Sequence, residues 1–117
     1  MIEQNGHPIL AIPNPKRVRV RLAGELLADT SGAITLFEAA YPGVCYIPRN
    51  GADMTVLRRS PHTTRCPFKG LASYYSIVTK DGVAENAVWT YEKPLPAACA
   101  IAGYLAYDPS KVDFREE

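Results

Sequence analysis

The segment from residue 71 to 91 constrains the fold of this 117-residue chain more than any other stretch. Two runs rich in aromatic and β-branched residues flank Asp81-Gly82, a dipeptide typical of a two-residue hairpin turn whose central positions need positive φ. A turn centred on this dipeptide places Tyr74 directly opposite Trp89. Both faces of the hairpin carry apolar side chains, so we expect it to lie at the centre of a sheet.

Ten prolines are spread along the chain, and this frequency argues against long helices. Shorter runs of alternating or apolar residues predict further strands separated by turns. These runs are residues 17–22, 26–30, 33–38, 44–49 and 104–107. The short turn at Ser31-Gly32 predicts that the runs 26–30 and 33–38 form a meander. A short helix is expected at 97–102, because Pro96 precedes this run and Gly103 follows it. The sequence therefore predicts an all-β fold of antiparallel sheets with at most one or two short helical turns.

The length and composition predict a single globular domain spanning residues 1–117. Hydrophobic residues make up 47% of the chain and charged residues 21%, which argues against disorder. Residues 1–15 are rich in proline and lack periodicity, so we expect a coil arm that lies over the domain. Residues 108–117 are predicted to form a polar tail.

The formal net charge of +1 argues against binding to nucleic acid or to an anionic membrane surface. No basic segment followed by an apolar run is present near Met1, so a signal peptide is not expected. The apolar run 97–106 is shorter than the roughly 20 residues that a membrane span needs. Three cysteines (Cys45, Cys66 and Cys99) lack the paired spacing of zinc or redox motifs. We therefore expect a reduced, cytoplasmic protein without metal or cofactor, and the oligomeric state stays open.

The densest group of reactive side chains lies in residues 60–70, which we expect to form a loop against the hairpin. It contains His62, Cys66 and Lys69. Cations or an imidazole nearby activate a thiol, so Cys66 is a candidate nucleophile with His62 as base and Lys69 as electrostatic stabiliser. A small buried apolar position is the more usual role of a free cysteine, and Cys66 also suits a ligand contact.

Several polar and aromatic side chains elsewhere suit a ligand pocket. Glu38 ends an apolar strand, where a carboxylate needs a partner if it is buried. Arg49 and Lys69 are candidates to hold an anion, although salt bridges to carboxylates explain them equally well. The aromatic cluster of Trp89, Tyr74 and Tyr91 forms either core or a pocket wall. The predicted ligand-binding set is Glu38, Tyr46, Arg49, Cys66, Lys69, Tyr74 and Trp89.

Residues 17–22 alternate basic and apolar side chains, which is typical of a half-buried strand. Its arginines, Arg17, Arg19 and Arg21, form either a solvated face or an interaction surface. Three functional hypotheses follow. The favoured one is a pocket for a small polar or anionic ligand, lined by Arg49, Lys69, Cys66 and Trp89. The alternatives are a cysteine-dependent enzyme using Cys66, and a protein-interaction module without a catalytic site.

The order of several motifs resembles the bacterial domain of unknown function 427 family. The most specific motifs are Cys66-Pro67-Phe68-Lys69-Gly70 and Trp89-Thr90-Tyr91. The resemblance implies a small all-β domain similar to the β-tent architecture, whose relatives include zinc-binding modules and B-type methionine sulfoxide reductases. The paired CxxC ligands of those relatives are missing here, so their metal is not carried over. A nucleotidyltransferase label has been attached to the family, but this sequence lacks a glycine-serine and paired-aspartate signature.

Overall fold

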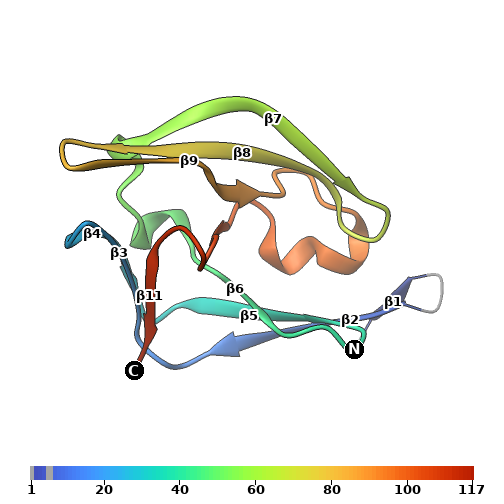
Figure 1. Cartoon of the computed structure of the whole chain (residues 1–117). Helices are drawn as coiled ribbons and strands as arrows, with labels where there is room; N and C mark the ends of the chain where they lie inside the picture. Colours follow the sequence, from blue (N-terminus) through green and yellow to red (C-terminus); the bar gives the residue numbers. More distant parts are fainter. Residues whose placement is uncertain (1, 5–6) are drawn as a thin grey trace.

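The computed structural model describes residues 2–4 and 7–117, with side chains from residue 8 onward, and this part folds into three antiparallel sheets (Figure 1). The first, in the order β1-β2-β5-β6, contains β1 (Ile2–Gln4), β2 (His7–Asn14), β5 (Ala33–Glu38) and β6 (Val44–Tyr46). The second, in the order β10-β9-β8-β7, contains β7 (Leu57–Cys66), β8 (Gly70–Thr79), β9 (Gly82–Thr90) and β10 (Leu105–Tyr107). The third, in the order β11-β3-β4, contains β3 (Val18–Leu22), β4 (Glu25–Thr30) and β11 (Asp113–Glu116).

The all-β prediction is confirmed. The helical segments among the described residues are short 3-10 turns: η1 (Arg49–Gly51), η2 (Met54–Val56) and η3 (Pro96–Ile101). The last of these confirms the expected helix after Pro96. Within the described range, none of these turns has the length and apolar character that crossing a membrane would require.

The β8–β9 hairpin pairs Tyr74 with Trp89, as predicted, but its turn lies one residue earlier than predicted. The last pair before the turn is Thr79–Gly82, so the two loop residues are Lys80 and Asp81. A register shift farther along the hairpin offsets this difference. Asn86 adopts a positive φ of 51° at the shift, a conformation that asparagine tolerates better than most residues. The aromatic pair therefore forms because a bulge compensates for the unexpected turn.

Alternating side chains of β6 separate two apolar clusters. Ile47, directly after β6, is buried in a cluster with Val18 and Val20, and Cys45 packs against the same cluster. Tyr46 points the other way, into a cluster that includes Ile9. The strand predicted at residues 44–49 is confirmed for Val44–Tyr46, and its side chains alternate between the two clusters as far as Ile47. Two backbone hydrogen bonds of 2.8 Å join Ile47 to Leu105, so the end of β6 also links the first sheet to the second.

The predicted coil arm and polar tail are both wrong. Residues 7–14 form β2, whose Ile9 is 1% exposed, and residues 9–14 pair with β5. Sheet pairing overrides the proline content here, because a proline occupies a strand wherever its missing N–H is not needed in the ladder. Residues 113–116 form β11, which pairs with β3. Residues 1, 5 and 6 of the expected arm lie outside the described residues.

Two further expectations are corrected. Residues 60–66 are not a loop but belong to β7, and residues 63–66 pair with β8 after a register shift at residues 60–62. The strands on either side of Ser31-Gly32 do not form a meander with each other. Instead, β4 pairs with β3 and β5 pairs with β2, so this turn carries the chain from one sheet to another. Local turn signals cannot specify this choice, since the strand that each neighbour pairs with is set by long-range packing.

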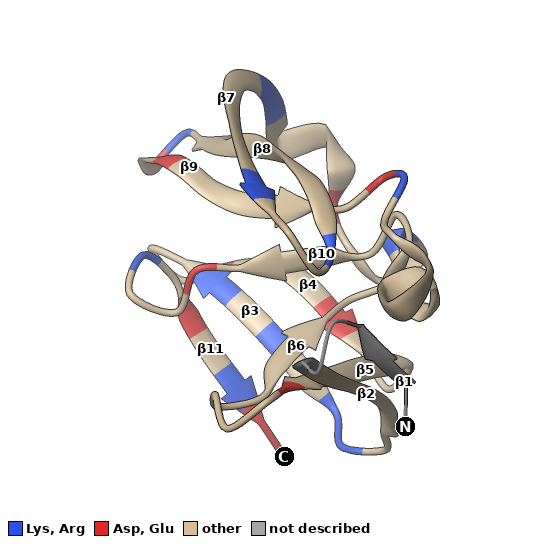
Figure 2. Cartoon of the chain, turned by 90° about the vertical axis from the view of Figure 1, so that its right-hand side faces the viewer, with Lys and Arg blue, Asp and Glu red and all other residues tan. Residues whose placement is uncertain are grey.

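Arg17, directly before β3, and Arg19, within β3, both have acidic partners. Figure 2 shows the charged segments along β3 and β11 of the third sheet. Arg17 donates two hydrogen bonds to Asp29, at 2.8 and 2.9 Å. Arg19 donates a 3.0 Å hydrogen bond to Glu117 at the end of the chain. Hydrogen bonding from Arg17 lowers the pKa of Asp29 to about 2. Much of the predicted arginine stripe is therefore paired within the third sheet.

We expect Asp29→Asn to lower the free energy of unfolding at neutral pH. The depressed pKa of Asp29 means that its contribution is complete above the ordinary carboxyl pKa of roughly 3.9 and is lost as the pH falls towards about 2. Urea denaturation at pH 7, 4 and 2.5 should show that the difference in the free energy of unfolding between wild type and variant becomes smaller over this pH range. Asp113→Asn is the control, because Asp113 pairs with Arg115 of its own strand at the surface. A gap that stays constant down to pH 2.5 would contradict the assignment.

Candidate functional site

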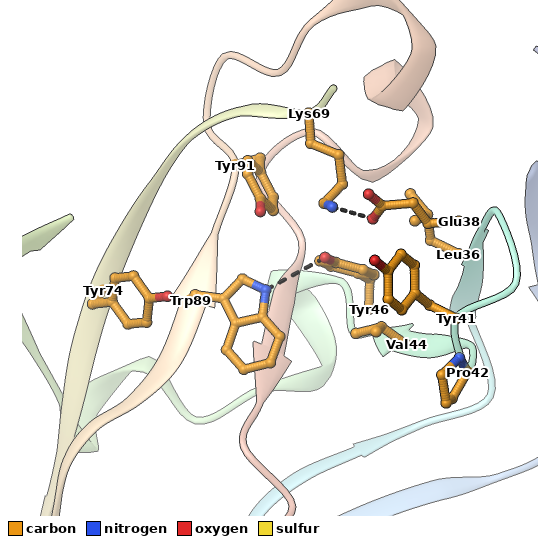
Figure 3. A pocket seen from close by; sticks show the side chains of 10 residues that line it. All are labelled: Leu36, Glu38, Tyr41, Pro42, Val44, Tyr46, Lys69, Tyr74, Trp89 and Tyr91. Carbon is orange, nitrogen blue, oxygen red and sulfur yellow. Dashed lines mark hydrogen bonds and ion pairs between the residues drawn. The ribbon is translucent and has the colours of Figure 1, made fainter. Parts of the chain in front are cut away.

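A cavity of about 230 Å³ opens between the first sheet and the β8–β9 hairpin (Figure 3). Strands β5 and β6 and their connection form one side of it. Strands β8 and β9, with the residues next to their ends, form the other side. The lining residues are Leu36, Glu38, Tyr41, Pro42, Val44, Tyr46, Lys69, Tyr74, Trp89 and Tyr91.

An ion pair between Lys69 and Glu38 crosses this cavity (Figure 3). Lys69 is only 9% exposed, and its ammonium donates hydrogen bonds to Glu38 and, at 3.3 Å, to the Cys66 sulfur. The same ammonium lies 5.7 Å from the centre of the Tyr91 ring. Burial alone lowers the pKa of Lys69, but the hydrogen bonds to Glu38 and Cys66 outweigh it and leave the pKa above its ordinary value. Lys69 is therefore a fixed cation whose charge Glu38 balances.

The Cys66-Pro67-Phe68-Lys69-Gly70 motif forms the tight connection that positions Lys69. Cys66 pairs with Gly70, which leaves a three-residue hairpin loop between β7 and β8. Such loops favour glycine at a positive φ, and Gly70 has a φ of 107°. The backbone N–H of Leu95 donates to the Lys69 carbonyl at 2.9 Å and anchors the loop. The motif therefore fixes the direction of the lysine locally.

Aromatic side chains form the rest of the cavity wall. The Trp89 indole N–H donates to the Tyr46 hydroxyl at 3.4 Å, and burial raises the pKa of Tyr46, which is 1% exposed. The centres of the Tyr74 and Trp89 rings lie 6.4 Å apart. Trp89 and Tyr74 also pack against the second apolar cluster. The same aromatic side chains therefore contribute both to the core and to the cavity wall, so the two interpretations hold together.

Arg49 does not join Lys69 in this cavity, which corrects the expected anion clamp. Its Nε donates to the Gly103 carbonyl at 2.8 Å, and its guanidinium lies 3.7 Å from Glu92. The guanidinium carbon also lies 6.0 Å from the centre of the Tyr75 ring. The chain leaves β6 at Tyr46 and turns through η1, so Arg49 is carried away from the cavity.

The predicted pairing of Cys66 with His62 also finds no geometric support. The two residues are four positions apart in the extended strand β7, which corresponds to about 13 Å along the chain. The centre of the His62 ring instead lies 4.6 Å from the centre of the Tyr74 ring. Cys66 is half-buried behind Lys69 and is not among the residues that line the cavity. Of the predicted nucleophile, base and stabiliser, only Cys66 and Lys69 are in contact.

Among the side chains that the structure describes, no three His, Cys, Asp or Glu groups lie close enough together to hold a metal ion. The side chain of His7 lies outside that part of the chain.

The structure brings together five of the predicted ligand-binding residues around the cavity and adds others. The five are Glu38, Tyr46, Lys69, Tyr74 and Trp89. Tyr41 was not predicted from the sequence. It is 67% exposed, and the sign that could have indicated it was its position as an aromatic residue in a turn soon after Glu38. Tyr91 was recognised as part of the aromatic cluster but was left out of the predicted set. Its position two residues after Trp89 placed it on the same strand face.

Comparison with protein families matches residues 10–117 to a family described as a domain of unknown function (DUF427). The matched range contains every residue that lines the cavity. A comparison with curated proteins gave no match.

Breaking the Lys69–Glu38 pair from either side should destabilise the fold. We expect Lys69→Met and Glu38→Gln each to lower the free energy of unfolding by about 1–3 kcal/mol, because each removes one charge from a largely buried, hydrogen-bonded ion pair. The double variant should recover part of this loss. Urea denaturation followed by far-ultraviolet circular dichroism measures all four proteins. Strictly additive losses would show that the two side chains do not stabilise each other.

Proposed function

Since the chain belongs to the DUF427 family, whose description names no activity, we propose from the site itself that this domain binds a small, planar, uncharged polar molecule beside Trp89. The observation that carries the proposal is a buried donor and acceptor pair, Lys69 and Glu38, inside a cavity walled by aromatic rings. Aromatic walls with a few convergent polar groups are characteristic of small-molecule sites.

The size of the cavity limits the ligand. Its volume of about 230 Å³ is below the range of roughly 300–1,000 Å³ that drug-sized ligands occupy. A molecule of one aromatic ring with a short polar substituent fits this space. Trp89 and Tyr74 offer ring faces and edges against which such a ring stacks favourably.

The balance of charge limits the polar group of the ligand. Lys69 supplies hydrogen-bond donors and Glu38 supplies acceptors, so together they match a group with one acceptor and one donor, such as a primary amide. A carboxylate gains from Lys69 but is repelled by Glu38. An amine gains from Glu38 but is repelled by Lys69. A neutral amide avoids both penalties.

The alternatives have weaker geometric support. A cysteine enzyme of the expected type needs a base beside Cys66, and His62 contacts Tyr74 instead. An interaction surface on β3 would have to compete with the pairs that Arg17 and Arg19 make with Asp29 and Glu117. A reducing, cytoplasmic setting suits a chain whose three described cysteines are all free thiols.

Intrinsic fluorescence provides a direct binding test, because Trp89 is the only tryptophan in the chain and lines the cavity. Benzamide, benzoate and benzylamine share one ring and differ in the charge of the polar group. We expect saturable changes in Trp89 fluorescence with an order of affinity in which benzamide exceeds both charged probes. Fluorescence that is unchanged by all three probes would contradict the proposal.

Variants of the ion pair should change this order in opposite directions. Glu38→Gln leaves a net positive site, so benzoate should gain at least about tenfold relative to benzamide, or about 1.4 kcal/mol. Lys69→Met leaves a net negative site and should shift the preference towards benzylamine. Arg49→Ala is the matched control, since it removes a cation outside the cavity, and it should leave the order unchanged. If every variant loses the binding of all three probes, the substitutions have damaged the fold instead.

A further inference from the structure

We propose that Cys66 and Lys69 form a reversible sulfur–nitrogen cross-link when a peroxide oxidises Cys66. We also propose that this link weakens ligand binding in the cavity. The inference deepens the proposed function, because it describes the regulation of the same site. The formation of the link, however, does not depend on ligand binding. Cys66 is also the reactive side chain at this site that the proposed binding role leaves unused.

The two reacting atoms are already in contact. The Lys69 nitrogen lies 3.3 Å from the Cys66 sulfur. The three-residue loop fixes both ends of the contact, with Cys66 paired to Gly70 and the Lys69 carbonyl held by Leu95. Reacting atoms held about 3–3.5 Å apart react far faster than the same groups free in solution. Glu38, in contact with the ammonium, supplies the proton acceptor that the amine needs before it can attack.

The chemistry proceeds in two balanced steps. First, the Cys66 thiol attacks hydrogen peroxide, the O–O bond breaks, and sulfenic acid and water form; sulfur is oxidised by two electrons and peroxide is reduced. Second, Glu38 takes a proton from the Lys69 ammonium and the resulting amine attacks the sulfur. The S–N bond forms as the S–O bond breaks, and the leaving hydroxide takes the proton from Glu38 to become water. A further proton leaves the nitrogen for solvent, which gives a neutral sulfenamide.

The link changes the charge of the cavity. Lys69 loses its positive charge, while Glu38 keeps its negative charge and no longer faces an ammonium group at Lys69. The cross-linked protein should therefore resemble Lys69→Met in its probe preference, with weakened binding of benzamide. A thiol reductant restores the Cys66 thiol and the Lys69 ammonium, so the change is reversible.

The other two cysteines provide internal comparisons. Burial raises the pKa of Cys45 to about 12, so this thiol is rarely ionised and should react slowly with peroxide. Cys99 is exposed on η3 and should oxidise without attachment to a lysine. A link specific to Cys66 therefore distinguishes the effect of its neighbours from general thiol oxidation.

Peptide mapping tests the link without any ligand. The full chain is treated with hydrogen peroxide, digested with trypsin and examined by mass spectrometry. Trypsin should no longer cleave after Lys69, and residues 66–80 should appear as one peptide lighter by two hydrogens than its reduced form. Treatment with dithiothreitol before digestion should restore cleavage. Further oxidation of Cys66 to sulfinic acid, with cleavage after Lys69 intact, would overturn the proposal.

Two conservative variants separate the link from other products. Cys66→Ser removes the sulfur and Lys69→Arg keeps a cation that trypsin still recognises. In both variants the linked peptide should be lost, and in Lys69→Arg the Cys66 sulfenic acid should instead proceed to sulfinic acid. Persistence of the two-hydrogen mass loss in Lys69→Arg would assign it to another reaction and overturn the link.

The regulatory effect is measured separately on the wild-type chain. Peroxide should lower the affinity for benzamide, measured by Trp89 fluorescence, by at least about tenfold. Dithiothreitol should restore this affinity. The oxidised Cys66→Ser protein should keep its response. A link that forms while benzamide binding stays unchanged would overturn the regulatory role alone. A link that forms in a protein that never binds any probe would overturn the proposed function while leaving the cross-link in place.

Discussion

Each strand of the β8–β9 hairpin presents apolar side chains to both faces of its sheet, and both faces have to be covered because leaving either in water forfeits its hydrophobic stabilisation. On one face, Ile77 and Val88 are buried with β3 and β4 residues. On the other, Tyr74 and Trp89 pack against the cluster that contains Ile9 and residues of η3. The first and third sheets can therefore be understood as the two covers of one hairpin.

The cavity lies where one of these covers is incomplete. The aromatic rings of the hairpin meet the first sheet across a space that the Lys69–Glu38 pair spans. A cation and a carboxylate that are this poorly exposed are tolerated because each satisfies the other and Lys69 has an additional partner in Cys66. The same pair that makes the cavity polar also connects the β7–β8 loop to the end of β5. The stability of this region and the proposed binding consequently depend on the same two side chains.

Three residues of one short loop region combine different chemical properties. Lys69 provides a charge that faces the cavity, Gly70 provides the backbone geometry of the turn, and Cys66 provides a thiol against the ammonium. The loop is anchored by a backbone hydrogen bond from Leu95. The proposed link between Cys66 and Lys69 would therefore act directly on the charge of the site.

Local sequence patterns determined the all-β class, the strand alternation around Tyr46 and Ile47, and the aromatic pair Tyr74–Trp89. These features follow from the two-residue periodicity of strands and from turn-forming residues, which act over short distances. Only the tertiary structure decided that residues 7–14 complete a sheet, that Arg49 leaves the cavity and that Lys69 meets Glu38. These outcomes depend on which strands pair across the chain, and a sequence pattern within one strand carries no information about its partner.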